Sequence, residues 1–344
     1  MFLARLTECA GVSGQEAEVR AVIIEEIKDY VDGVKVDALG NVIALKRGRK
    51  AGDGGVKLML AAHMDEVGLM VTYIEKSGML RVEPVGGVDP RVLVSKVVLV
   101  GKDKIPGVIG AKAIHLQERE ERENAFKIED LLVDIGAKDK QDAEKAVRLG
   151  DAVVFATEFQ EIGNRRAKAK AFDDRVGCAV VAELLKQRFD YTVYGVFTAQ
   201  EEVGGRGATV AAYSINPDLA LVFEGTTASD VPEAKEHTYA TTLGKGPALT
   251  FMDRSVLVKK DIIKRLLELA EEGNIPVQFR RSTAGGTDAG RIYLQREGIP
   301  SEVISVPTRY IHSPVSVIDL ADVDNTIRLA SAFLHSIEDR GLPL

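Results

Sequence analysis

The sequence predicts an α/β fold, a doubly wound mixed sheet with helices on both faces, interrupted by a small β-rich, barrel-like insert. Apolar runs of strand length alternate with helical patterns in residues 1–66 and 164–344, as in sheets covered by helices. Residues 67–163 instead give short strands separated by glycine- and proline-containing turns, which favours a barrel or sandwich. Several acidic and histidine residues follow the apolar runs, where open α/β sheets bind ligands.

The amino-acid composition excludes several classes of protein. The chain has 344 residues, of which 45% are hydrophobic and 28% charged, so it is globular. A net charge of −7 without a long basic run argues against a nucleic-acid partner. Two cysteines, Cys9 and Cys178, exclude a disulfide scaffold and favour a reducing compartment. Without a signal-peptide pattern or a bilayer-length apolar stretch, we expect a cytoplasmic protein with no membrane partner.

The first α/β segment begins with a predicted helix over residues 14–31. Apolar residues recur there at helical spacing, and Ser13-Gly14-Gln15-Glu16 has the spacing of a capping box. Residues 34–37 and 42–45 flank a turn and predict a hairpin. Residues 56–62 form a continuous apolar run, which suits a central strand covered on both faces.

The predicted insert contains one helix, over residues 139–149, among its strands. Residues 117–124 are almost wholly charged and are predicted to form an exposed loop. The expected strands are 69–75, 80–84, 94–100, 105–109 and 152–157.

After residue 171 strands and helices alternate again. The expected strands are 191–198, 219–223, 248–252, 277–280 and 301–306. The expected helices are 174–188, 207–213, 256–272, 288–296 and 319–338.

Two adjacent carboxylates, Glu201 and Glu202, follow the apolar run 193–197 and precede Gly204 and Gly205. Adjacent strand residues point to opposite faces. Both carboxylates can therefore serve one site only if the strand gives way to a loop, which the glycines permit. Other apolar runs are followed by further candidate residues, namely His63, Asp65, Asp173, Glu224 and His312.

Two imidazoles and three carboxylates suit borderline metals such as zinc or cobalt, and five protein ligands are enough for a pair of ions. The candidate ligands are His63, Asp173, Glu202, Glu224 and His312. Asp65 is placed to orient the His63 ring, and Glu201 is left over as an acceptor for a proton from water. Each residue taken alone could instead have a purely structural role. A histidine at a strand end is often a hydrogen-bonded polar group and not a metal ligand, and Asp173-Asp174 could cap a helix.

Five short motifs extend this interpretation through a family resemblance. In chain order they are His63-Met64-Asp65-Glu66-Val67-Gly68, Phe172-Asp173-Asp174-Arg175-Val176-Gly177, Glu201-Glu202-Val203-Gly204, Gly285-Gly286-Thr287-Asp288-Ala289 and Arg309-Tyr310-Ile311-His312-Ser313-Pro314. Together they resemble the M42 family of metallo-aminopeptidases, the glutamyl aminopeptidase and TET peptidase group. The resemblance covers nearly the whole chain.

The resemblance implies two divalent ions per subunit, zinc or cobalt, bridged by Asp173. His63 and Glu224 would complete the coordination of one ion, and Glu202 and His312 would complete that of the other. Glu201 would be the general base and Asp65 the partner of His63. Many relatives have Asp where this chain has Glu224, so this ligand departs from the family pattern.

The resemblance also implies an assembly and a reaction. The insert would mediate dimerisation, and dimers would build a twelve-subunit homo-oligomer that removes N-terminal residues from peptides. Gly285, Gly286, Thr287 and Asp288 are expected to line the pocket for the first residue, because glycine allows close approach; alternatively they form a helix start capped by Thr287. Other possibilities left open are a dipeptidase, deacylase or carboxypeptidase, a glycosidase, and an inactive peptidase fold that serves as a scaffold.

Overall fold

The computed structural model describes residues 1–50, 55–232 and 234–344. Eleven strands of the described residues form one mixed sheet. In spatial order the main strands are β1 (Gly33–Val36), β2 (Val42–Lys46), β12 (Thr192–Thr198), β3 (Lys57–His63), β13 (Leu219–Thr227), β16 (Ser301–Arg309), β17 (Ser316–Asp319), β11 (Arg166–Ala169) and β10 (Gln160–Ile162). The central strands β12, β3, β13 and β16 run parallel, while β2 and β17 pair antiparallel at either side.

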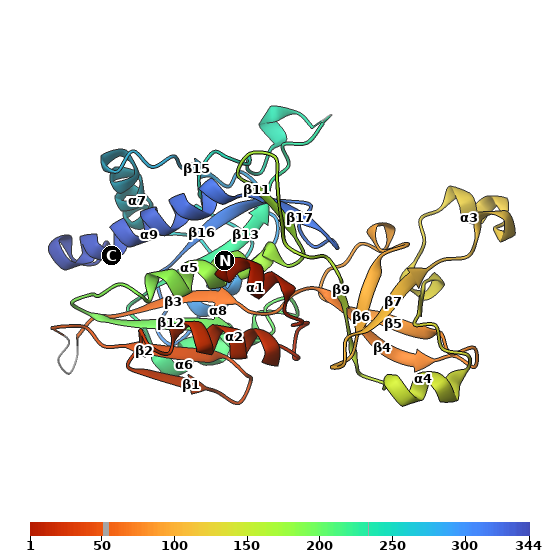
Figure 1. The fold of residues 1–344 in the computed structure, drawn as a ribbon. Coiled ribbons are helices and arrows are strands. Elements are labelled where there is room, and N and C mark those ends of the chain that lie inside the picture. The colour runs from red at the N-terminus through yellow and green to blue at the C-terminus, as the bar shows by residue number, and fades with distance from the viewer. Residues whose placement is uncertain (51–54, 233) are drawn as a thin grey trace.

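Helices cover both faces of this sheet (Figure 1). Helices α5 (Phe172–Leu184) and α9 (Leu320–Arg340) pack on one face, and α6 (Arg206–Ile215) and α8 (Asp288–Tyr293) on the other. Helices α1 (Phe2–Glu8) and α2 (Ala17–Ile27) lie against α5, and α7 (Lys260–Glu272) lies against α9. The predicted doubly wound α/β architecture is confirmed.

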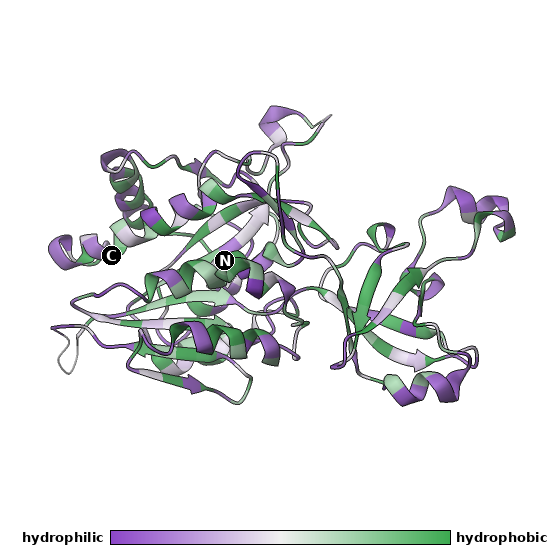
Figure 2. Cartoon of the chain, viewed as in Figure 1, coloured by the Kyte–Doolittle hydropathy of each residue, from purple (hydrophilic) through white to green (hydrophobic). Residues whose placement is uncertain are grey.

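The insert is a closed barrel set beside the large sheet (Figure 1). Its strands in spatial order are β4 (Gly68–Ile74), β5 (Leu80–Val85), β8 (Leu132–Asp134), β7 (Ile105–Gly110), β6 (Val97–Val100) and β9 (Ala152–Phe155). The barrel has its own hydrophobic core, which includes Leu69, Val100 and Val133 and is separate from the core of the large sheet. Figure 2 shows the apolar residues gathered in the strands of both sheets and polar residues on the outlying helices α3 (Arg119–Glu123) and α4 (Lys140–Ala146).

Several elements differ from the sequence prediction. Helix α2 begins at Ala17 without a side-chain cap, because the Ser13 hydroxyl donates instead to the Asp65 carboxylate at 2.6 Å. The charged stretch around residue 120 is exposed as expected, but it contains the short helix α3. Helix α1 and the short strands β8, β10 and β17 were not predicted.

Two strands also continue past their predicted ends. Strand β13 extends to Thr227 and β16 to Arg309, so Glu224 lies inside a strand rather than after one. Two small strands, β14 (Ala248–Leu249) and β15 (Gln278–Phe279), extend the sheet beside β16. No helix in the described ranges has the length and apolar character needed to cross a bilayer.

Candidate metal centre

The candidate residues converge at the carboxyl ends of the central parallel strands. His63 is the last residue of β3 and pairs in register with Thr198, the last residue of β12. The chain then turns, with positive φ at Gln200 (61°), Gly204 (119°) and Gly205 (64°). The loop that the sequence required between strand and glycines is therefore present, and both carboxylates reach the same site.

Asp173 lies between the two histidines, with a different oxygen toward each. Its Oδ1 is 3.3 Å from His63 Nε2, and its Oδ2 is 3.3 Å from His312 Nε2. Glu224 Oε2 lies 3.4 Å from His63 Nε2, and Glu202 Oε2 lies 3.4 Å from His312 Nε2. Each imidazole thus faces Asp173 and one glutamate, so the five predicted ligands form one connected group.

Asp65 and Glu201 lie next to this group, and both are near the His63 ring. His63 Nδ1, the ring nitrogen that faces away from Asp173, hydrogen-bonds with the Asp65 backbone carbonyl at 3.1 Å, and Asp65 Oδ1 lies 3.4 Å from it. The same carboxylate accepts hydrogen bonds from the backbone N–H groups of Glu201 at 2.9 Å and Glu202 at 3.1 Å. The Glu201 carboxylate approaches His63 Nε2 only to 4.0 Å, so it stands near the group without being part of its close contacts.

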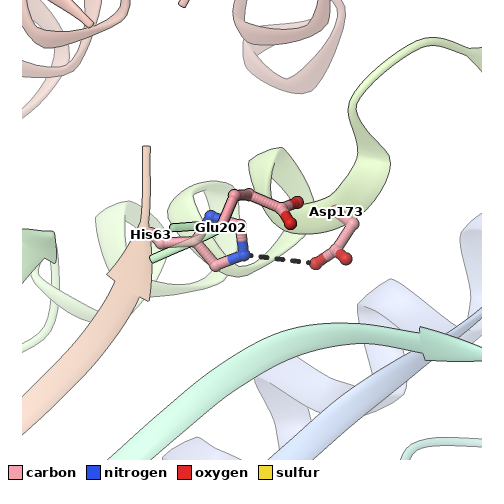
Figure 3. A group of neighbouring side chains, drawn as sticks. All are labelled: His63, Asp173 and Glu202. Atoms are coloured by element: carbon pink, nitrogen blue, oxygen red, sulfur yellow. Dashed lines mark ion pairs between the residues drawn. The ribbon is translucent and has the colours of Figure 1, made fainter. Parts of the chain in front are cut away.

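Unpartnered carboxylate oxygens indicate that the group fits cations. Asp173 Oδ1, Glu202 Oε1 and Glu224 Oε1 are buried without a hydrogen-bond partner among the described residues. Burying a carboxylate oxygen in this way is costly unless a cation neutralises it. Figure 3 shows Asp173 pointing toward the His63 ring with the Glu202 carboxylate beside them, and one possible ligand atom from each of these three residues lies within 4.8 Å of the others.

A second possible ligand group joins Asp174 to His63 and Glu224, also within 4.8 Å. Hydrogen bonds distinguish the two aspartates. Asp174 Oδ2 accepts from the His63 backbone N–H at 3.2 Å, and its Oδ1 accepts from the Gly177 N–H at 2.9 Å. Both Asp174 oxygens are therefore engaged by backbone, whereas Asp173 presents an oxygen to each histidine, and Asp173 is the better candidate ligand.

Burial and mutual contact shift the pKa values of these groups in the metal-free chain. Burial raises the pKa of Glu201 well above its usual value and that of Glu202 to about 8. Burial alone would lower the pKa of His312, but the hydrogen bond with Asp173 raises it to about 9. Perturbed pKa values concentrated in one cleft are typical of functional sites.

Two cavities adjoin the group, and Glu201 and His312 line both of them. The first, of about 450 Å³, is lined by Gly285, Gly286 and Thr287 together with His63 and Glu224. The second, of about 570 Å³, is lined by Glu202, Gly87 of the barrel and part of the same glycine loop.

Within the predicted pocket segment, Asp288 has a separate position. It lines neither cavity and is buried, accepting a hydrogen bond from the Thr198 hydroxyl. Thr287 also accepts a hydrogen bond from the Ala289 N–H at the start of α8. The helix-cap interpretation and the pocket interpretation of Thr287 therefore both describe this residue.

Sequence reasoning missed a buried ion cluster behind the site. Lys170 Nζ donates to both oxygens of Glu66 at 2.7 Å, and an Arg175 nitrogen donates to Glu66 Oε1 at 3.1 Å. Arg175 also donates to the Met64 carbonyl at 2.9 Å, so it fixes the backbone between His63 and the barrel. The available signal was that Glu66 and Arg175 stand inside two of the quoted motifs, beside candidate ligands.

Comparison with known proteins identifies relatives along the whole chain. A family model described as M42 glutamyl aminopeptidase matches residues 40–329. The chain is 43% identical over 330 residues to a protein of Acetivibrio thermocellus, covering 95% of this chain and 96% of the relative. It is 36% identical to the lysyl aminopeptidase of Pyrococcus furiosus, with 98% and 97% covered. It is 32% identical to the glutamyl aminopeptidase of Lactococcus lactis, with 96% and 93% covered.

Solved structures agree with the sequence relatives. An aminopeptidase from Desulfurococcus kamchatkensis superposes with a TM-score of 0.92 at 40% identity, covering 97% of this chain and 94% of the other. The Pyrococcus horikoshii TET1 peptidase gives 0.85 at 34% identity, with 97% and 98% covered. A Thermotoga maritima structure described as an endoglucanase gives 0.81 at 41% identity, with 98% and 97% covered. The chain belongs to the M42 glutamyl aminopeptidase family.

Proposed function

We propose that this protein is a metal-dependent aminopeptidase that hydrolyses the first peptide bond of its substrates. The observation that carries the proposal is the position of Asp173, whose two oxygens face two different histidines at 3.3 Å each. A carboxylate in that position can bridge a pair of ions. Family membership supports the same reaction.

The ligands that we assign to the pair follow from the contacts. Asp173 would bridge, His63 and Glu224 would hold one ion, and Glu202 and His312 the other. When bound, zinc or cobalt ions would act as Lewis acids toward water and the scissile carbonyl. Glu224 has a longer side chain than the aspartate expected at this position, but it fits the role of a metal ligand. One of its oxygens contacts the His63 ring, and the other has no hydrogen-bond partner among the described residues.

Glu201 is the proposed general base. It is buried beside His63 without being in close contact with it, so its carboxylate is free to take the proton of the attacking water and pass it to the leaving amine. Asp65 would orient the His63 ring through its backbone carbonyl and its nearby carboxylate, and the carboxylate accepts from the backbone N–H of Glu201. Gly286 and Thr287 would support the substrate where the two cavities meet.

The decisive experiment measures metal content and hydrolysis together. Purified protein would be analysed for zinc and cobalt, then assayed on aminoacyl-anilides, acetylated anilides and dipeptides with and without a chelator. An aminopeptidase cleaves the free amine substrates and loses activity with the chelator. Cleavage of the acetylated substrates alone would support a deacylase instead, and cleavage confined to dipeptides would support a dipeptidase.

A glycosidase is a second candidate because one structural relative is described as an endoglucanase. Glycosidases use two carboxyl groups on opposite sides of the glycosidic bond, about 5–9.5 Å apart. In this chain Asp173, Glu202 and Glu224 instead crowd around histidines. Carboxymethyl cellulose added to the substrate panel tests this reaction directly.

The protein is also proposed to form homo-oligomers through the barrel. The Pyrococcus horikoshii relative is described as assembling into a tetrahedron or a large octahedral shell. In this chain the barrel exposes apolar side chains, including Val97 (54% exposed) and Val108 (45%), which are paired in register on neighbouring strands. A dimer that assembles further to a dodecamer would cover them, and light scattering after size-exclusion chromatography measures the mass.

A further inference from the structure

The 570 Å³ cavity beside the candidate metal centre is lined by two arginines, Arg254 and Arg291, and we call it the arginine-lined cavity. Both arginines are exposed, and so is Leu294 (70%), which lines the same cavity. The neighbouring 450 Å³ cavity instead reaches Val303 and Ser305, which are buried in β16. Of the two cavities, the arginine-lined one therefore suits a ligand that continues toward solvent.

Neither arginine of this cavity has a partner within the described structure. No hydrogen bond or ion pair joins the guanidinium group of Arg254 or Arg291 to another described residue. The chain has more acidic than basic residues, 52 against 45, and an arginine of the same domain, Arg309, is paired with Asp230 at 2.6 Å. Two guanidinium groups beside the candidate site thus remain available to a ligand.

The charge of this cavity favours an anion once metal is bound. Its acidic lining residues among the described ones are Glu201 and Glu202, which are the proposed base and a proposed ligand. Two divalent ions would balance the four negative charges of Glu201, Glu202, Asp173 and Glu224. The two arginines would then supply the net charge of the cavity, and a cleft with charges of one sign attracts ligands of the opposite sign.

Both arginines contact loops that carry proposed site residues. A Cβ atom on Gly205 would lie 2.5 Å from Arg291 Cγ, and one on Gly204 would lie 3.7 Å from its Nη2, so this side chain lies against the turn that follows the two glutamates. The backbone N–H of Arg254 donates to the Gly285 carbonyl at 3.1 Å, in the loop shared by the two cavities. The fold therefore holds both arginines close to the proposed reaction.

We propose that the arginine-lined cavity receives the part of the peptide that follows the scissile bond, and that Arg254 and Arg291 bind a carboxylate there. Guanidinium groups match carboxylates in planar, two-point hydrogen bonds. The carboxylate is either the C-terminus of a short peptide or the side chain of an acidic residue after the scissile bond. This inference rests on the proposed aminopeptidase function and goes beyond it, because it concerns the leaving portion of the substrate and not its first residue.

The test uses peptides with one first residue: leucyl-alanyl-alanine, its C-terminal amide, and amides in which the second residue is aspartate or asparagine. In the wild type, kcat/KM should be about 10- to 100-fold higher for a peptide with a carboxylate than for its matched amide, the range of a hydrogen bond to a charged group.

The free acid against its amide tests the C-terminus, and aspartate against asparagine tests the side chain. Replacing both Arg254 and Arg291 with glutamine should bring the preferred ratio close to one. Arg206→Gln is the matched control, because Arg206 is exposed, bonds to Gln200 at 3.2 Å and lies outside the cavity lining. This control should keep the ratio of the wild type.

Calorimetric binding of alanyl-alanine and alanyl-alanine amide, which resemble the leaving portion, supplies a readout independent of turnover. The wild type should bind the free acid more tightly, and the double variant should lose the difference. If no peptide is cleaved but this binding pattern holds, the aminopeptidase assignment fails and the carboxylate site stands. A wild type that cleaves acid and amide peptides equally in both comparisons, or a double variant that keeps the ratio of the wild type, overturns the inference.

Discussion

The Asp65 carboxylate accepts a hydrogen bond from the backbone N–H of Glu201, the proposed base, at 2.9 Å. The same carboxylate faces the His63 ring at 3.4 Å. Asp65 therefore contacts both a candidate metal ligand and the residue proposed to move the proton.

Asp65→Asn should lower metal affinity and kcat by up to about 10- to 100-fold, the usual range for changes beside a ligating histidine, because it removes the negative charge 3.4 Å from His63 Nδ1 while the backbone carbonyl stays in place. The asparagine amide would also place an N–H₂ donor opposite a backbone N–H or the Ser13 hydroxyl, both of which donate to Asp65 in the wild type, so at least one hydrogen bond would be lost. Metal titration and steady-state kinetics measure both effects. Ser13→Ala leaves the carboxylate in place and serves as the control, so an equal loss in that variant would refute the role of Asp65.

Glu201→Gln should retain the metals and lose about 10²- to 10⁴-fold in kcat, the usual contribution of a general base. The side chain is proposed to act on water and is not an assigned ligand, so metal content should match the wild type. Elemental analysis and anilide hydrolysis on the same sample separate the two quantities. Wild-type turnover in this variant would remove Glu201 from the mechanism.

Asp173→Asn and Asp174→Asn form a matched pair of neighbouring substitutions. The first should lower the amount of metal bound per subunit, because Asp173 faces both histidines. The second should retain metal but cost about 1–3 kcal/mol of stability, because an amide nitrogen would replace an oxygen that accepts from His63 or Gly177. Metal analysis and thermal unfolding distinguish them, and the opposite pattern would make Asp174 the ligand.

Metal binding should release protons near neutral pH. In the metal-free chain burial raises the pKa of Glu202 to about 8, and contact with Asp173 raises that of His312 to about 9. Both groups hold a proton at pH 7 and must lose it to bind an ion. Affinity should therefore rise between about pH 7 and 9 and then level off. Calorimetry of zinc binding in buffers of different ionisation enthalpy counts the protons, and pH-independent affinity would contradict the assignment.

Glu66→Gln should destabilise the fold by about 3–5 kcal/mol, because it leaves Lys170 and Arg175 as uncompensated buried charges. Glu272→Gln is the control, since it breaks an exposed ion pair with Arg340 at 3.0 Å and should cost no more than about 1 kcal/mol. Urea unfolding of the two variants measures the difference. Similar losses would show that the buried cluster contributes no more than a surface pair.

The sequence predicted the elements whose signal is local. Residues 56–62 are continuously apolar and form the buried strand β3, and the helical spacing of 319–338 matches α9. Strands β8 and β10 have three residues each; β8 pairs with β7 and β5 of the barrel, and β10 pairs with β11, which follows it in the chain. Such short segments carry too little periodicity to be recognised alone.

The candidate site was predictable for a different reason. His63 and Glu201 each follow an apolar run, and parallel strands bring their carboxyl ends to one edge of the sheet. Ser13 shows the limit of this reasoning. Its spacing to Glu16 predicted a helix cap, but in the fold its hydroxyl donates to the carboxylate of Asp65, which is distant in sequence. Arg280, which lines the 450 Å³ cavity with His63, was missed because the pairing of β14 with β15 and β16 brings it next to the site.

The proposed ligands span the chain from His63 to His312, with the whole barrel between the first histidine and Asp173. During synthesis the ribosome must therefore reach residue 312 before the last imidazole can join the others. A shorter nascent chain lacks one of the five proposed ligands and cannot hold both metal ions in the proposed way. Hydrolytic activity would thus be withheld until His312 has been added.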